Sequence, residues 1–398
     1  MRTLKTITSI QFHAQKSGAA LFMAFIVLGS FAACDPEPPL HLYDAQERTI
    51  DVPMVDMDLE VYWDYQLSFG IEYNWEAEWY YGWDEIDVTT FGQIGYEEPK
   101  VFNVRRYYTG DIPFARHTGV IRDTIEGTHF QGMYDWGYWD VMLWNKIITP
   151  DGVQSIIIDE GSSLDSVIAY TNQSMHPSRY NAPRYTHSFY APEPLFAGYE
   201  QGIEINRDLS GFTFDDERGV WVRKLEMVLK PITYIYLTQV ILHNNKGRIS
   251  SIDGTADLSG MARSTNLNTG VAGNDAITVY FNAILKKDCD MNGELVDIIG
   301  GRLLTFGIPG NEANALTRAS EVKDENRHYM NFTMQFNNGM DSTFVFDVTD
   351  QVRERYKGGV LTVELDVDTV KIPRRSGGSG FDAVVKDYED GGTHEFEM

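Results

Sequence analysis

Residues 330–348 read MNFTMQFNNGMDSTFVFDV, and this stretch decides the fold class. Apolar and polar side chains alternate through 330–336, and the apolar ones are Met330, Phe332, Met334 and Phe336. Successive side chains of a strand point to opposite faces of a sheet, so this alternation predicts a strand with one buried face. Residues 337–339 are a hairpin-turn signal, and the alternation resumes over 344–348. The stretch therefore predicts a β-hairpin.

The same alternation recurs on both sides of this hairpin, at 55–63 and at 360–370. Further strands are expected at 100–107, 138–144, 153–159, 223–230, 232–242, 277–285 and 294–306. Pro231 lacks a backbone N–H, so a bulge or an edge position is expected there. Short helices are expected only at 311–323 and 348–356. Many short strands, each with one solvent-exposed face and one buried face, predict an all-β protein built from antiparallel β-sandwiches.

The length and the polar stretch at 207–218 predict two tandem domains in the folded part. The N-terminal β-sandwich domain is expected at 50–206 and the C-terminal one at 219–373. Residues 374–398 form a Gly/Ser-containing linker and an acidic tail. Both domains follow an N-terminal segment that is not expected to be part of either β-sandwich.

That N-terminal segment reads as an export signal. Arg2, Lys5 and Lys16 are its only charged residues, and an apolar run from 19 to 33 follows. The run is shorter than the roughly 20 residues that a membrane-spanning helix needs. Two alanines precede Cys34, which predicts a lipoprotein signal peptide at 1–33 with lipid attachment to Cys34; the alternative is an ordinary secretory signal. Residues 34–49 form an acidic, proline-rich tether.

The net charge excludes nucleic-acid partners, and the absence of catalytic motifs argues against enzymatic activity. The formal net charge is −25, and because residues 1–33 hold three basic and no acidic residues, removing them makes it −28. Such a chain repels phosphate backbones, so no nucleic-acid partner is expected. The sequence holds no zinc-protease, serine-hydrolase or phosphate-loop string. We therefore expect no enzymatic activity, no catalytic residue and no cofactor.

The string Asp288–Glu294 resembles the start of a calcium loop, with Asp288, Asp290 and Asn292 at the ligand positions. The twelfth position, which should supply a bidentate carboxylate, is Ile299. Asp, Asn and Gly between two strands also make a turn. The turn is the preferred interpretation, and no metal site is expected.

In the stretch 73–87, Trp75, Trp79 and Trp83 lie among the carboxylates of Glu76, Glu78, Asp84 and Glu85. Exposed aromatic clusters mark binding surfaces, and rings beside carboxylates can stack on sugars. The alternative is that these rings cover the end of a sandwich. If they bind, the chain could be a glycan-binding surface lipoprotein of a polysaccharide-capture system.

Four stretches resemble the fimbrillin-like lipoproteins of Bacteroidetes, a group that includes anchor subunits of type V pili and cell-adhesion proteins of unknown function. They are GMYDWGYWDVMLWN at 132–145, APEPLFAG at 191–198, the segment 231–240 followed by GTADLSGMA at 254–262, and FDVTDQV at 346–352 followed by Gly358 and Gly359. Their order behind a lipoprotein signal strengthens the resemblance.

The resemblance implies two tandem transthyretin-like domains on the outer membrane, held by the lipid and facing the cell exterior. It implies a role in cell adhesion or in anchoring a fimbrium, with other pilus subunits or surface ligands of host or bacteria as partners. Pilus subunits of this kind join by β-strand addition. Residues 381–387 are expected to form a terminal strand that pairs with the chain's own second domain or with a neighbouring subunit.

Overall fold

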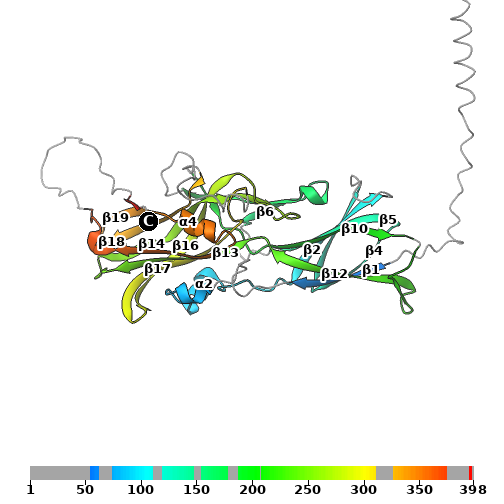
Figure 1. Ribbon diagram of the computed structural model, residues 1–398, viewed down its shortest axis with the longest axis horizontal. Coiled ribbons are helices and arrows are strands. Elements are labelled where there is room, and N and C mark those ends of the chain that lie inside the picture. The colour runs from blue at the N-terminus through cyan, green and yellow to red at the C-terminus, as the bar shows by residue number, and fades with distance from the viewer. Residues whose placement is uncertain are drawn as a thin grey trace, which may run out of the picture. The chain divides into compact units, whose positions relative to one another are not determined.

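The computed structural model describes residues 54–61, 74–110, 119–147, 154–177, 187–206, 208–310, 326–373 and 394–396. These residues form two large β-sheets and one small sheet, with short helical turns between strands (Figure 1). The prediction of an all-β protein is confirmed. Cys34, the expected helix at 311–323 and the expected strand at 381–387 lie outside the described residues.

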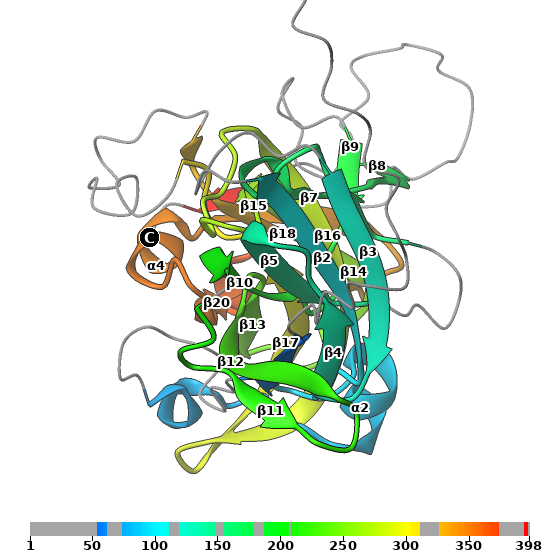
Figure 2. The ribbon, with the colours of Figure 1, turned by 90° about the vertical axis from the view of Figure 1, so that its right-hand side faces the viewer.

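The first sheet has the strand order β3-β2-β5-β10-β12-β1-β4, and β11 pairs with β12. Figure 2 shows its run from β12 to β3. Its strands are β1 (Met54–Val61), β2 (Val101–Gly110), β3 (Gly119–Glu126), β4 (His129–Met133), β5 (Gly137–Asn145), β10 (Phe196–Ile205), β11 (Thr213–Asp215) and β12 (Val220–Pro231). Phe102, Trp139, Leu143 and Phe196 are among its buried core residues. Neighbouring strands are antiparallel except β1 and β12, which run parallel.

The second sheet has the order β20-β13-β17-β16-β14-β18-β19-β21, and β9 joins β8 to β16. Its strands are β8 (Gln173–Pro177), β9 (His187–Tyr190), β13 (Tyr234–His243), β14 (Ile249–Ala262), β16 (Ala276–Met291), β17 (Glu294–Thr305), β18 (Tyr329–Phe336), β19 (Asp341–Asp347), β20 (Gly359–Asp366) and β21 (His394–Phe396). The third, small sheet is β15-β7-β6: β6 (Ile156–Asp159), β7 (Ile168–Thr171) and β15 (Ser264–Asn266).

The hairpin predicted from 330–348 is β18 and β19. The strands pair antiparallel from Tyr329 opposite Asp347 to Gln335 opposite Asp341. Gly339 has a φ of 77°, a conformation that glycine adopts without strain, and its N–H donates to the Phe336 carbonyl. The four alternating apolar residues of β18 are all buried in one core cluster with Phe344 and Phe346 of β19. This part of the fold follows from local sequence alone.

Strand β13 departs from the expected pattern because both of its faces are buried. Tyr236 and Val240 belong to the core of the second sheet, whereas Ile235 and Leu237 face a separate apolar cluster. The second cluster is completed by rings from the segment 75–96, which lies against the opposite face. Continuous burial on two faces removes the alternation that a half-exposed strand would show.

Strand pairing does not follow the domain division predicted from the sequence. β12 falls within the predicted C-terminal domain, yet it pairs with β1 and β10 of the first sheet. In the other direction, β9 falls within the predicted N-terminal domain and pairs in parallel with β16. Pro231 ends β12, and β13 begins three residues later at Tyr234. The boundaries at 206 and 219 stay predictions.

Two further local predictions can be compared with the structure. The helix expected at 348–356 is confirmed as α4 (Thr349–Glu354). The strand expected at 360–370 ends earlier, because β20 stops at Asp366 and a 3-10 turn, η5 (Val367–Thr369), follows. The Asp366 side chain accepts from the Asp368 N–H at 3.1 Å and so caps that turn.

Candidate functional site

The tryptophan-rich segment consists of two short helical turns. η1 (Trp75–Glu78) is a 3-10 turn, and α2 (Glu85–Phe91) is an α-helix capped by Asp84. The Asp84 carboxylate accepts from the Ile86 and Asp87 N–H groups, and the Asp84 N–H donates to the Asp87 carboxylate in return. This reciprocal capping box satisfies helix donors that would otherwise face solvent unpaired. No pattern in the sequence predicted a helix in this segment.

The three tryptophan rings lie against the sheet. Trp75 is 9% exposed and packs with Ile235, Leu237, Leu304 and Val360 from three neighbouring strands. Trp79 and Trp83 are partly buried beside them, with ring centroids 6.4 Å apart. The Nε1–H of Trp79 donates to the Gly82 carbonyl at 3.0 Å. This packing supports the sheet-cover interpretation, and ligand contact by these rings stays a prediction.

Gln239 of β13 fastens this segment to the sheet. Its side-chain oxygen accepts from the N–H groups of Tyr80 and Tyr81, at 3.0 and 3.3 Å. Its amide nitrogen donates to the Glu78 carbonyl at 2.6 Å and to the Thr362 hydroxyl at 2.9 Å. A buried amide with donors and acceptors satisfied is a specific attachment, because losing any partner would leave a polar group unpaired.

A buried ion-pair cluster lies at the other end of the segment. Asp87 has no exposed surface, accepts from the Tyr81 hydroxyl at 2.9 Å and forms an ion pair with Lys286 of β16. Lys286 also pairs with Asp84 at 2.8 Å. Burial lowers the pKa of Lys286, but its hydrogen bonds to the two carboxylates outweigh burial and raise that pKa overall. A lysine held in its charged form is no nucleophile, so this cluster acts as a structural clamp.

The calcium-loop look-alike is the hairpin turn between β16 and β17. Met291 pairs with Glu294, and the two residues between them, Asn292 and Gly293, have φ values of 54° and 90°. Positive φ at both central residues is the tight hairpin turn that Asn-Gly favours. The Asp290 carboxylate accepts from the Gly293 N–H at 2.6 Å. Among the described residues, no group of three or more His, Cys, Asp or Glu side chains is placed to hold a metal.

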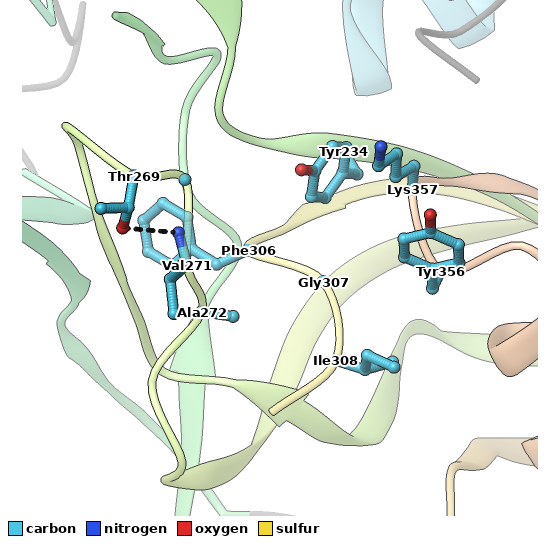
Figure 3. A pocket seen from close by; sticks show the side chains of 10 residues that line it. Tyr234, Thr269, Val271, Ala272, Phe306, Gly307, Ile308, Tyr356 and Lys357 are labelled. Carbon is cyan, nitrogen blue, oxygen red and sulfur yellow. Dashed lines mark hydrogen bonds between the residues drawn. The ribbon is translucent and has the colours of Figure 1, made fainter. Parts of the chain in front are cut away.

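A pocket of about 370 Å³ lies where three loops meet the start of β13, and no pattern in the sequence predicted it (Figure 3). Its lining comes from the start of β13, the loop at 269–272 after β15, the loop at 306–308 after β17, and residues 356–357 after α4. Phe306 and Ala272 are buried at its base, whereas Val271 is 44% exposed at its rim. No local string marks such a site, because its parts are separated in the sequence.

The loops of this pocket are held in place by their own hydrogen bonds. The Thr269 hydroxyl accepts from the Val271 N–H at 3.2 Å, and the Gly307 N–H donates to the Thr305 hydroxyl at 3.0 Å. Gly307 has a φ of +82°, and a Cβ there would lie 3.2 Å from both the Tyr234 ring and the Tyr356 carbonyl. Glycine is thus required at this point of the pocket wall.

The far edge of the second sheet carries the C-terminal strand. β19 pairs with β18 on one side and with β21 on the other, in parallel register from Phe344 opposite His394 to Phe346 opposite Phe396. A strand near the C-terminus, at 394–396, therefore adds to this edge, and the strand expected at 381–387 lies outside the described residues.

In the part of the chain that the structure describes, no helix is long and apolar enough to span a membrane. No model of a protein family and no curated protein matches the sequence.

Solved structures resemble the chain at low sequence identity. A candidate adhesin from Bacteroides ovatus is 12% identical with a TM-score of 0.46, and the match covers 81% of this chain and 94% of that one. A candidate adhesin from Bacteroides thetaiotaomicron is 9% identical with a TM-score of 0.40, covering 81% and 94%. The fimbrial anchor protein Mfa2 from Porphyromonas gingivalis is 11% identical with a TM-score of 0.37, covering 78% and 90%.

Proposed function

We propose that this chain is a non-catalytic surface lipoprotein, a fimbrillin-like subunit for cell adhesion or fimbrium anchoring that joins its neighbours by β-strand addition. The observation that carries the proposal is the pairing of the C-terminal strand β21 with the edge strand β19. An edge strand presents unpaired N–H and C=O groups, which a strand from the same chain or another chain can complete.

The β19 edge is suited to exchange because the strand itself is well anchored and its outer partner is short. Phe344 and Phe346 of β19 are buried in the core, whereas β21 contributes only three residues to the pairing. Replacing so short a strand costs few backbone hydrogen bonds. A neighbour's C-terminal segment can therefore compete for the same edge, which gives a subunit-to-subunit joint.

Strand β1 supports the anchoring role. It is the first described strand after Cys34, and it pairs with β12 along its whole length and with β4 over 54–58. Val55 and Leu59 on this strand are buried in the first core. A pull on a lipid at Cys34 would reach the described part of the chain at β1, which is held by backbone pairing on both sides.

Removing residues 376–398 tests strand addition. Native gel electrophoresis of the lipidated protein in detergent should show higher-order species for the full chain and their loss for the deletion. Adding a peptide of residues 376–398 should also reduce assembly of the full chain. Unchanged assembly after the deletion would contradict strand addition between subunits.

A matched pair of substitutions separates pairing from tail length. Glu395→Pro removes a backbone donor inside β21 and should weaken assembly, whereas Glu395→Ala should leave it intact.

Cys34→Ser tests the lipid anchor independently: the variant should move from the outer-membrane fraction to the soluble fraction. A membrane-bound Cys34→Ser protein would refute lipid anchoring at this residue.

A further inference from the structure

We propose that helix α4 blocks one edge of the second sheet, because the Gln351 side chain occupies the place that a neighbouring strand would take along β20. A strand from a second copy of this chain is thereby directed to the β19 edge. The inference deepens the proposed function, on which its meaning for assembly rests, since it names the edge from which partner strands are kept away.

β20 is an edge strand of the second sheet in the part of the chain that the structure describes. It pairs with β13 in parallel, from Gly359 opposite Tyr236 to Asp366 opposite His243. Along a strand, the backbone N–H and C=O groups of successive residues point alternately to one side and to the other. Every second residue of β20 therefore turns these groups away from β13. Such a row of groups is an edge with which another strand can pair.

Gln351 satisfies both backbone groups of one outward-facing residue. The Thr362 N–H donates to the side-chain oxygen of Gln351 at 2.9 Å, and the Thr362 carbonyl accepts from the amide nitrogen of Gln351 at 2.8 Å. A carboxamide has the same kinds of donor and acceptor as a peptide group, so it makes the two bonds that a strand would make. Arg355 extends the block, because its Nη1 donates to the Val360 carbonyl at 2.5 Å. Val360 and Thr362 are two positions apart, as residues that face the same side of a strand must be.

Helix α4 is held beside this edge by packing and by a second ion pair (Figure 2). Its Val352 is buried in the same core cluster as Leu361 and Val363 of β20. In addition, the Nη2 of Arg355 donates to the Glu78 carboxylate of the tryptophan-rich segment at 2.9 Å. A side chain on an anchored helix loses less entropy when it binds the strand, which favours the bonds that block the edge.

The remainder of the edge carries charge. Glu364 and Asp366 are exposed on the last part of β20. Glu364 pairs with Nε2 of His243 on β13 at 3.1 Å. Asp366 accepts from the side-chain amide of Asn244 at 3.0 Å. Charged side chains on an edge strand oppose the addition of another strand, so the part of β20 beyond the α4 block is also protected.

The β19 edge differs in kind from the β20 edge. Its outer side is covered by the three residues of strand β21 rather than by side chains of a helix. One strand can replace another with the same pattern of backbone hydrogen bonds, whereas displacing Gln351 requires α4 to move. The second sheet therefore offers β19 to its partners, and copies that join head to tail at this edge form a filament or a ring.

Hydrogen exchange tests the block in the natural protein. The lipidated full chain in detergent is followed by mass spectrometry with fragmentation, and rates are corrected for intrinsic exchange. The Thr362 amide should exchange as slowly as that of Val363, which faces β13, and about tenfold more slowly than the outward amide of Glu364. Gln351→Leu should speed exchange at Thr362 about tenfold and leave Val363 unchanged. Exchange at Thr362 as fast as at Glu364 in the natural protein, or equal in the two proteins, would overturn the proposal.

Self-association tests the consequence for assembly. Gln351→Leu is combined with removal of residues 376–398, so that this tail cannot supply a strand. Sedimentation velocity should then show a concentration-dependent dimer, because two open β20 edges can pair around a two-fold axis. Glu354→Leu in the same deletion is the control: it adds the same side chain at an exposed position of α4, leaves the Gln351 bonds in place and should add no dimer. Equal sedimentation of the two variants would refute a role of Gln351 in blocking association.

Folding and the proposed function are checked separately. Circular dichroism and urea unfolding show whether Gln351→Leu folds, and if it does not, the comparison of Thr362 with Glu364 in the natural protein decides. Assembly of the natural chain that survives removal of residues 376–398 would contradict strand addition by the tail. It would leave the exchange rate of Thr362 as a valid test of the block, so the two failures are distinguishable.

Discussion

The ring of Tyr81 lies directly on the backbone of Gly300. A Cβ added at Gly300 would come within 2.3 Å of the ring atom Cδ2 of Tyr81, closer than side chains approach one another. Tyr81 is only 2% exposed, and its hydroxyl donates to the buried carboxylate of Asp87. The close seating of this ring on β17 lets the segment 75–91 cover a sheet face that would otherwise be wet.

Gly300→Ala should therefore destabilise the protein. The added methyl group displaces the Tyr81 ring, and overpacking of this kind costs about 1–3 kcal/mol in the free energy of unfolding. Urea unfolding followed by tryptophan fluorescence measures the change. Gly119→Ala, where an added Cβ meets nothing within 4 Å, is the matched control and should change stability little. Equal effects of the two substitutions would argue against the seating of Tyr81.

Gln239→Ala should loosen the tryptophan segment while the sheet stays folded. The substitution removes the acceptor for the Tyr80 and Tyr81 N–H groups and the donor to the Glu78 carbonyl. Leaving buried backbone groups unpaired costs about 1–3 kcal/mol. The emission maximum of tryptophan should shift to longer wavelength as the rings meet water. Thr362→Val removes only one of the Gln239 hydrogen bonds and should have a smaller effect.

The free energy of unfolding should decrease as the pH is lowered, because His328 is buried. Burial lowers the pKa of His328 to about 3, below its ordinary value of 6.5. Below pH 6.5 the unfolded chain therefore takes up a proton that the folded chain does not. Stability from this residue is complete above pH 6.5 and is lost as pH falls toward 3, at up to about 1.4 kcal/mol per pH unit.

His328→Asn should make the stability of the protein less dependent on pH between pH 7 and pH 4. Urea midpoints measured from pH 7 to pH 4 should decline less steeply for the variant than for the natural protein. His187→Asn, at an exposed position of β9, is the control and should keep the natural slope. A variant slope equal to the natural one would show that His328 does not carry the effect.

The turn between β16 and β17 should be indifferent to calcium. Asp290→Ala removes the hydrogen bond to the Gly293 N–H and should lower the free energy of unfolding by about 1 kcal/mol. Adding Ca²⁺ to the natural protein should leave Tm unchanged, because the carboxylate is engaged by the backbone. A rise in Tm with Ca²⁺ that disappears in Asp290→Ala would restore the metal interpretation.

The elements that were predicted correctly are those whose information is local. The β18–β19 hairpin, the turn at Asn292 and Gly293 and the helix α4 each depend on residues within a few positions of one another. The strand predicted at 223–230 is β12, Val220–Pro231, but no local pattern indicates which strands it pairs with. The hydrogen bond from the Tyr80 N–H to Gln239 joins residues 159 positions apart in the sequence, and no local sequence pattern predicts a contact between residues so widely separated.

The sequence by itself determined that the chain is β-rich and where its hairpins turn, and it predicts that Cys34 carries a lipid. Those features follow from alternation, turn chemistry and a signal string, all of them short-range properties. Only the tertiary structure decided that β12 belongs to the first sheet, that the tryptophan rings cover β13, and that Tyr234, Tyr356 and Lys357 share a pocket. These relationships depend on which strands pair and which faces meet, because many pairings bury a similar apolar area and only packing of the whole chain selects one of them.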